Sequence, residues 1–249
     1  MRSFVMLLPL AAACGGCPVW QSQQVPVPAT LETEQTTGVR YWRYVPTGYS
    51  PDRAWPMAVA LHGTIPYDTA KRQIDEWKRL AEDEHFIVVA PELQSTQGLS
   101  PIVDKNWTDK LKRDEKVILA VMDEMCQNYR IESSAILLHG FSAGGFPLLY
   151  TGLHNPERFS AMVARGCNCR QELLDQLEVT DETRKLPVLI ICGKDDSPII
   201  QKQSWMAFRF LRENRCFKAE HDEFRGGHIR RPDLAYKYWR RHWPKQPES

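Results

Sequence analysis

A serine lies between glycines near the middle of this 249-residue chain, where an apolar segment ends. The stretch HGFSAGGFP, residues 139–147, gives Ser142 the pattern G-x-S-x-G directly after the apolar run AILL. Glycine is favoured where a backbone turns sharply or is closely approached. A serine on such a turn, between a strand and a helix, can present its hydroxyl as a nucleophile. An ordinary turn is the alternative, and the elements expected on either side favour the nucleophile.

A serine nucleophile needs a base to accept its proton and an acid to orient that base. Two carboxylates, Asp195 and Asp196, follow the apolar run PVLIIC in the stretch GKDD. We predict that Asp196 is the acid, because it stands three residues past Gly193, and that Asp195 is a solvated turn residue. In the alternative interpretation both carboxylates only cap the following helix.

The expected base is His228, which follows Gly226 and Gly227 in the stretch FRGGHIRR. Two glycines leave room for an imidazole in a flexible loop to reach the serine. His221 is the alternative, but it stands at the end of a predicted strand. The order Ser, then Asp, then His is the order of α/β folds that carry a nucleophile on a strand–helix turn.

Two backbone N–H groups must stabilise the negative oxygen that forms during attack on a carbonyl. One is expected from Ala143, immediately after the serine. The other is expected from Thr64 in the stretch LHGT, which ends another apolar run.

Strand-like and helix-like segments alternate along the chain, and the internal strands are apolar throughout. Strands are expected within 38–46, 55–63, 86–93, 134–140, 159–166, 186–193 and 216–221. Helices are expected from residue 68 and within 111–129, 147–154, 171–177, 203–214 and 232–243. This pattern predicts one α/β domain, residues 38–249, with a mostly parallel sheet, helices on both faces and no large cap domain.

Composition restricts the partners of the chain. The formal net charge is only +1, which gives no general electrostatic attraction for nucleic acid. The cysteines and histidines do not have the spacing of a zinc site, so we expect neither a metal nor another cofactor. Pairing among Cys126, Cys167, Cys169, Cys192 and Cys216 is left open, although one disulfide involving the stretch CNC would fit an exported protein.

The N-terminal segment differs from the remainder of the chain. Arg2 is followed by FVMLLPLAAAC, a short apolar run that ends in small residues. We interpret residues 1–13 as a signal peptide, Cys14 as a lipidation site with Cys17 as a weaker candidate, and residues 14–37 as a polar tether. The protein is therefore expected to be exported, as a bacterial envelope lipoprotein or else as a periplasmic or secreted protein.

The order LHGT, GFSAGG, GKDD and GGH resembles the α/β-hydrolase superfamily, and within it the compact esterases that include polyhydroxybutyrate depolymerases and feruloyl esterases. The resemblance covers residues 38–243. It implies a serine esterase without a metal or other cofactor, which cleaves a small-molecule or polymer ester through an acyl-enzyme. We expect the protein to be a monomer. A prolyl-oligopeptidase-like peptidase and a non-catalytic envelope binding protein are the alternatives.

A long irregular stretch, residues 91–109, is expected to lie over the carboxyl edge of the sheet. Within it Trp107 is the predicted wall of the substrate pocket, and packing of this side chain under the next helix is the alternative. An uncapped cleft beside an aromatic side chain would suit short-chain or aryl esters better than long acyl chains.

Overall fold

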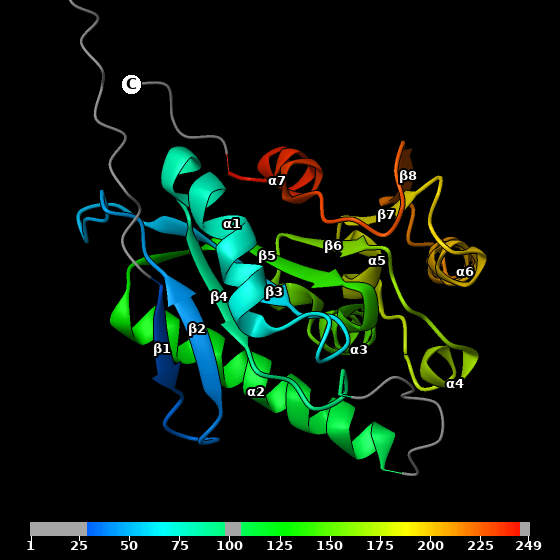
Figure 1. The fold of residues 1–249 in the computed structure, drawn as a ribbon, viewed down its shortest axis with the longest axis horizontal. Helices are drawn as coiled ribbons and strands as arrows, with labels where there is room; N and C mark the ends of the chain where they lie inside the picture. The colour runs from blue at the N-terminus through cyan, green and yellow to red at the C-terminus, as the bar shows by residue number, and fades with distance from the viewer. Residues whose placement is uncertain (1–28, 98–105, 245–249) are drawn as a thin grey trace, which may run out of the picture.

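The computed structural model describes residues 29–97 and 106–244. An eight-stranded, mostly parallel sheet forms the centre of this part of the chain (Figure 1). The strands are β1 Thr30–Thr33, β2 Arg40–Tyr44, β3 Trp55–Leu61, β4 Ile87–Pro91, β5 Ile131–Phe141, β6 Ala161–Arg165, β7 Val188–Gly193 and β8 Ala219–Phe224. Their spatial order is β1-β2-β4-β3-β5-β6-β7-β8. The β1–β2 and β2–β4 pairs are antiparallel and all the other pairs are parallel.

Helices connect the parallel strands and cover both faces of the sheet (Figure 1). They are α1 Ala70–Glu84, α2 Trp107–Asn128, α3 Gly145–His154, α4 Gln171–Leu174, α5 Asp181–Lys185, α6 Pro198–Glu213 and α7 Pro232–Arg240. Two short 3₁₀ turns, Ser142–Gly144 and Pro156–Arg158, lie on either side of α3. None of the helices described has both the length and the apolar character that spanning a membrane requires.

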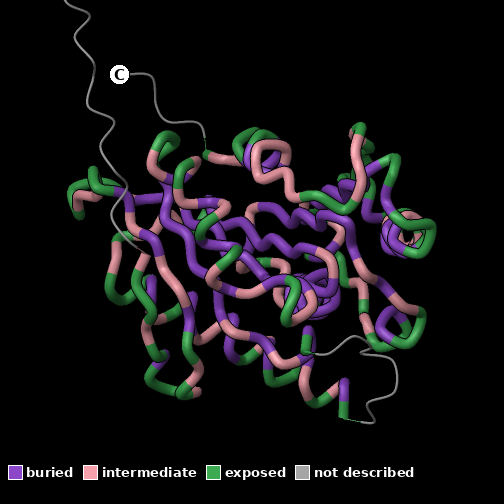
Figure 2. Tube along the Cα trace, in the orientation of Figure 1, coloured by how far each residue is buried: buried purple, intermediate pink, exposed green. Residues whose placement is uncertain are grey.

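The hydrophobic core consists of two layers, one on each side of the sheet. One layer joins α2, α3 and α6 to the sheet, and the other joins α1 and α7 to it. Successive residues of a strand point to opposite faces, so Val59 lies in the first layer and Ala60 in the second. Figure 2 shows the resulting buried centre of the sheet. The predicted mostly parallel sheet with helices on both faces is confirmed.

The local sequence explains how α1 is placed on its face. Its N-cap, Thr69, accepts a hydrogen bond from the backbone N–H of Arg72 at 3.2 Å. Ile74 and Trp77, one helical turn apart, are fully buried against the sheet. This packing holds the start of the helix, and with it the loop that leaves β3, at the carboxyl edge of the strands.

The sheet begins earlier in the chain than expected. Residues 30–33 form β1, although residues 14–37 were interpreted as a tether, and β2 is consequently the second strand of the sheet. Most side chains of β1 are exposed, so the strand lacks the alternation of apolar residues that predicts a strand. Glu34 stabilises the turn after it, since its carboxylate accepts hydrogen bonds from the N–H groups of Thr36 and Thr37 at 2.7 and 2.6 Å.

The segment between β6 and β7 holds only the two short helices α4 and α5. The first was expected within 171–177. The second, Asp181–Lys185, was not expected, because most of its side chains are exposed and it has no apolar stripe. A capping box formed by Thr180 and Thr183 begins it.

Candidate active site

Ser142 occupies the turn between β5 and α3, at the carboxyl edge of the sheet. Its φ angle is +53°, in the left-handed region that L residues other than glycine rarely adopt. The chain leaves a buried strand, turns through Ser142 and enters a buried helix. Strain of this kind persists only where the surrounding packing enforces it, and it is concentrated at functional sites.

The glycines beside Ser142 are required by close packing. A Cβ atom on Gly140 would lie 2.4 Å from the backbone oxygen of Gly144, and one on Gly144 would lie 2.6 Å from the backbone oxygen of Leu61. Real Cβ atoms do not approach other atoms so closely, so neither position accepts a side chain without a shift of the backbone. The turn that presents Ser142 therefore depends on both glycines of the G-x-S-x-G pattern.

The hydroxyl of Ser142 donates a hydrogen bond to Asn168 Oδ1 at 3.2 Å. The backbone of the two residues is also joined, because the N–H of Asn168 donates to the carbonyl of Ser142 at 3.0 Å. Asn168 in turn donates through Nδ2 to Gln203 Oε1 at 2.7 Å. Neither Asn168 nor Gln203 was expected at the site, because an amide in a loop and a glutamine in a helix carry no catalytic pattern.

His228 and Asp196 are hydrogen-bonded to each other, with 2.8 Å between His228 Nδ1 and Asp196 Oδ2. The Asp196 side chain is almost fully buried, and its other oxygen accepts a hydrogen bond from the N–H of Ser197 at 2.7 Å. Within the described residues no hydrogen bond joins His228 to Ser142. Asp196 thus orients the imidazole of His228, while the hydroxyl of Ser142 is hydrogen-bonded to Asn168.

Asp195 has a different partner. Its carboxylate accepts a hydrogen bond from the N–H of Gly226 at 3.1 Å, and its own N–H donates to the carbonyl of Gly226 at 2.9 Å. Asp195 therefore joins the β7 loop to the glycines that precede His228. The alternative base, His221, lies within β8 and stacks on Trp205 with 4.0 Å between the ring centroids.

The imidazole of His228 lies between Phe141 and the loop after β6. Its ring stacks on that of Phe141 with 4.8 Å between centroids and 30° between planes. On its other side is Gly166, where a Cβ atom would lie 2.8 Å from His228 Cε1. The φ angle of Gly166 is +53°, so a side chain there would be disfavoured by the backbone as well.

The loop after β3 passes directly beside the serine turn. A Cβ atom on Gly63 would lie 3.1 Å from Ser142 Cβ. Within the described residues, neither the N–H of Thr64 nor that of Ala143 donates a hydrogen bond to the protein. Two adjacent loops thus leave backbone donors free near Ser142, as a site for a developing oxyanion requires.

Arg230 connects the histidine loop to the loop after β3. Its guanidinium forms an ion pair with buried Asp68, with 2.6 Å between Nη2 and Oδ1. Asp68 Oδ2 accepts hydrogen bonds from the N–H of Gly63 and from Gln73 Nε2, both at 2.7 Å. Because Arg230 follows His228 by two residues, one ion pair fixes both loops. Sequence reasoning missed this pair, since its members are 162 positions apart.

A second buried ion pair, between Arg165 and Glu76, lies on the same side of the sheet. Arg165 also donates to Nε2 of His139, the first residue of the serine motif. Burial holds the pKa of His139 well below its usual range, and the nearby Arg165 charge lowers it further. His139 is therefore a neutral, structural hydrogen-bond acceptor beneath the site.

His62 is also structural. Its Nδ1 lies 2.8 Å from the carbonyl of Gly63, and its Nε2 accepts a hydrogen bond from the N–H of Leu93 at 3.0 Å. Burial lowers the pKa of this imidazole. The ring supports the loop that carries Thr64 and has no ring nitrogen left for a substrate.

The cysteines beside Asn168 are buried free thiols. Burial raises the pKa of Cys167 well above its usual range and that of Cys169 to about 12. Neither thiol ionises near neutral pH, so neither is a thiolate nucleophile. All five cysteines in the described part of the chain are unpaired.

Trp107, the expected pocket wall, is the first residue of α2 and is 8% exposed. Its ring packs edge-on against Phe146 of α3, with 5.1 Å between centroids. The contacts described are those of a core side chain, as the alternative interpretation expected. Part of the loop before it, residues 98–105, lies outside the described residues, as do residues 1–13 and Cys14.

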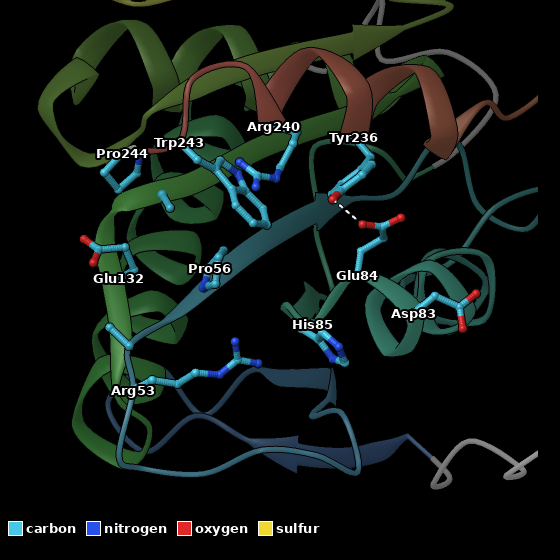
Figure 3. Close-up of a pocket in the computed structure, with 12 residues that line it drawn as sticks. Arg53, Pro56, Asp83, Glu84, His85, Glu132, Tyr236, Arg240, Trp243 and Pro244 are labelled. Carbon is cyan, nitrogen blue, oxygen red and sulfur yellow. Dashed lines mark hydrogen bonds between the residues drawn. The ribbon is translucent and has the colours of Figure 1, made fainter. Parts of the chain in front are cut away.

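A cavity of about 360 Å³ lies at the opposite edge of the sheet, next to the amino end of β3 and the carboxyl end of α7 (Figure 3). There Tyr236 donates a hydrogen bond to Glu84 at 2.6 Å, and Trp243 and Arg53 line other parts of the cavity. None of the candidate residues lines this cavity. Ligands of parallel α/β sheets bind at the carboxyl ends of the strands, where Ser142 and His228 lie.

Comparison with known proteins agrees with this geometry. Residues 94–233 match the model of the phospholipase/carboxylesterase family. The chain belongs to this family. The matched region includes Ser142, Asp196 and His228, whereas Thr64 lies outside it. The resemblance to α/β-hydrolase esterases that the sequence motifs suggested is confirmed.

Two curated relatives of this carboxylesterase-family chain are esterases or depolymerases by name. It is 29% identical over 170 residues to a bifunctional acetylxylan esterase/xylanase of Neocallimastix patriciarum, covering 68% of this chain and 23% of the relative. It is 29% identical over 135 residues to a poly(3-hydroxyalkanoate) depolymerase C of Paucimonas lemoignei, covering 51% of this chain and 31% of the relative. The matches thus span less than a third of either relative.

A solved structure has the same fold. The ferulic acid esterase of Anaeromyces mucronatus superposes with a TM-score of 0.64 at 20% identity. The match covers 90% of this chain and 94% of the esterase. At that identity the likeness shows the fold, which here is the α/β-hydrolase fold.

Proposed function

We propose that this chain is a serine esterase that hydrolyses carboxylic esters with Ser142 as nucleophile, His228 as general base and Asp196 as the orienting acid. The observation that chiefly supports this is the 2.8 Å contact between His228 Nδ1 and the buried Asp196 Oδ2. An imidazole that donates from Nδ1 to a carboxylate has Nε2 free to accept a proton. The family relation supports the same chemistry.

In the proposed first step, the Ser142 hydroxyl leaves Asn168 Oδ1 and donates to His228 Nε2. Rotation about the Cα–Cβ bond of the serine is the motion required, and hydrogen bonds of this kind commonly tighten only when substrate is bound. The oxygen attacks the ester carbonyl as the proton passes to His228. Asp196 stabilises the imidazolium that results.

The N–H groups of Ala143 and Thr64 receive the negative oxygen of the tetrahedral intermediate in this proposal. Asp68 supports the second donor, because it holds the N–H of the neighbouring Gly63. Collapse of the intermediate releases the alcohol, which takes its proton from His228. Water then hydrolyses the acyl-enzyme by the same steps, and the acid product leaves a free Ser142.

The names of the relatives support a small-molecule or polymer ester as substrate. A serine peptidase of the same fold and a non-catalytic binding protein are the competing functions.

A panel of 4-nitrophenyl esters and matched 4-nitroanilides distinguishes these three functions. We expect rapid hydrolysis of acetyl and butyryl esters and a steep fall in the rate towards palmitoyl esters. Faster cleavage of the anilides would favour a peptidase, and no turnover of either would favour a binding protein.

We also propose that the protein is exported, with removal of residues 1–13 and lipid on Cys14. The apolar run that precedes small residues at 11–14 supports this. Mass spectrometry of the mature protein from its native host tests it. An intact Met1 would refute both export by this signal and lipidation, whereas cleavage without lipid would refute only the anchor.

A further inference from the structure

A groove of about 300 Å³ lies between α4 and the first half of α6, at the same edge of the sheet as Ser142. This volume is at the lower end of the range for small-molecule sites. The side chains used below are Arg170 and Glu172 from the α4 segment and Ile199, Lys202, Gln203 and Met206 from α6.

Two side chains connect the groove to the Ser142 hydroxyl. Gln203, which lines the groove, accepts the hydrogen bond from Asn168 Nδ2 at 2.7 Å. Asn168 Oδ1 accepts the hydrogen bond from Ser142 Oγ at 3.2 Å. The groove is thus two hydrogen-bonded side chains away from the Ser142 hydroxyl, and a ligand that reaches both would pass over Asn168.

The wall that α6 contributes is apolar and open to solvent. Ile199 is 60% exposed and Met206 is partly buried. Ile199 follows Asp196 by three residues, so the loop that holds the acid leads directly into this wall. An exposed apolar surface beside a site fits the hydrocarbon part of a ligand.

The cations of the groove are unpaired. Within the described residues the Arg170 side chain has no ion pair or hydrogen bond, and its Nε atom is buried without a partner. Among the described residues Lys202 likewise forms no ion pair, and its side chain is exposed. Glu172 is the one carboxylate among the lining residues, so the groove has an excess of one positive charge. An unpaired cation beside an apolar wall can form a charge-assisted hydrogen bond with an anionic group of a ligand.

We infer that this groove binds an ionised carboxylate carried by the ester substrate, with Arg170 and Lys202 as its partners. The substrate class is thus an ester whose acyl or alcohol part continues through an apolar segment to a second, anionic carboxyl group. The apolar segment lies on Ile199 and Met206. This inference rests on the proposed esterase function and adds charge selectivity to it.

The test compares matched neutral and anionic esters. For the acyl side the pair is mono-4-nitrophenyl adipate and its methyl ester, and for the alcohol side it is 4-acetoxybenzoate and 4-acetoxybenzamide. Each kcat/KM is divided by the rate constant for hydroxide-catalysed hydrolysis of the same ester. We expect the anionic member of one pair to be favoured by about tenfold or more, the size of one charge-assisted hydrogen bond.

Variants of the lining residues test whether the preference for anionic esters arises in the groove. Arg170→Gln and Lys202→Gln should each lower the anionic-to-neutral ratio, mainly through KM, and together bring it to about one. Glu172→Gln should raise the ratio, because it removes the opposing charge. Arg209→Gln, on an exposed position of the same helix outside the groove, is the matched control and should leave the ratio unchanged.

The outcomes separate the two proposals. Rapid hydrolysis of the neutral esters with no preference for either anionic ester would overturn the groove assignment and leave the esterase function standing. A preference that survives the double variant would also overturn it. No hydrolysis of any ester would refute the proposed function and this inference with it.

Discussion

Ser142 Oγ donates its hydrogen bond to Asn168 Oδ1, 3.2 Å away, while the imidazole of His228 is bonded only to Asp196 among the described residues. The free protein thus holds the serine in a resting position. For attack on a substrate, the Ser142 hydroxyl must give up its hydrogen bond to the amide oxygen of Asn168 and form one to a ring nitrogen of His228. The strength of the Asn168 acceptor should therefore affect the rate.

Asn168→Asp should lower kcat/KM for 4-nitrophenyl acetate by about a hundredfold. A carboxylate accepts a stronger, charge-assisted hydrogen bond from the hydroxyl, and its charge opposes the oxyanion that forms nearby. Asn168→Ala removes the acceptor without adding charge and should cost less than about tenfold. Equal activities for the two variants would show that Asn168 does not control the serine.

Exchange of Asp196 for Asn should reduce kcat by about 10⁴-fold, because an amide cannot stabilise the imidazolium or fix the ring in the same tautomer. Asp195→Asn is the matched control. Asp195 only accepts from the N–H of Gly226, and an amide oxygen can replace that contact, so the loss should be within about tenfold. Steady-state kinetics decides between the two carboxylates, and the reverse order would make Asp195 the orienting acid.

Gly166→Ala should abolish most of the activity by displacing His228. The new Cβ would lie 2.8 Å from His228 Cε1, on a backbone with φ of +53°. Gly38→Ala has the same left-handed strain, at φ of +67°, but nothing lies within 4 Å of its Cβ. Both variants should lose about 1–2 kcal/mol of stability, and only Gly166→Ala should lose activity. Similar kinetics for the two would place the imidazole elsewhere.

Stability should fall as the pH drops through the usual pKa of histidine. Burial lowers the pKa values of His62 and His139 in the folded protein, so below about pH 6.5 the unfolded chain binds protons that the folded chain does not. The free energy of unfolding then decreases by up to about 1.4 kcal/mol per pH unit for each histidine. Burial raises the pKa values of Glu76 and Asp114. These two carboxyl groups therefore increase the free energy of unfolding as the pH falls, in opposition to the histidines.

His139→Gln isolates one of these contributions, because the glutamine oxygen can still accept the hydrogen bond from Arg165. Denaturant unfolding at several pH values between 5.5 and 7.5 gives the slope for each protein. The variant should show a smaller decrease in stability towards pH 5.5 than the parent. Parallel slopes would mean that His139 is protonated in the folded state or not buried.

The sheet and the candidate residues at its carboxyl edge were predictable because they depend on local signals. Apolar runs that end in glycine turns mark β3, β5 and β7, and the residues that follow those turns include Thr64, Ser142 and Asp196. β1 escaped prediction because its exposed side chains carry no pattern. The capping box that begins α5 is likewise a local polar feature without an apolar stripe.

The supporting contacts could not be predicted. Asn168, Gln203 and Arg230 acquire their roles only when segments far apart in the chain are brought together, and a single sequence records no such pairing. For Trp107 the local signal left two interpretations open, and the structure favours core packing. Its position after an irregular stretch suggested a pocket wall, while its described contact is with Phe146 in the core.

The most direct test of the account is to label the protein with a fluorophosphonate probe and locate the modified residue by peptide mass spectrometry. The account predicts one modified residue, Ser142, and no labelling of a folded Ser142→Ala variant. It also predicts that this variant loses esterase activity by about 10⁴-fold or more. Labelling of Ser142→Ala at the rate of the parent protein, or modification at another serine, would contradict the central claim.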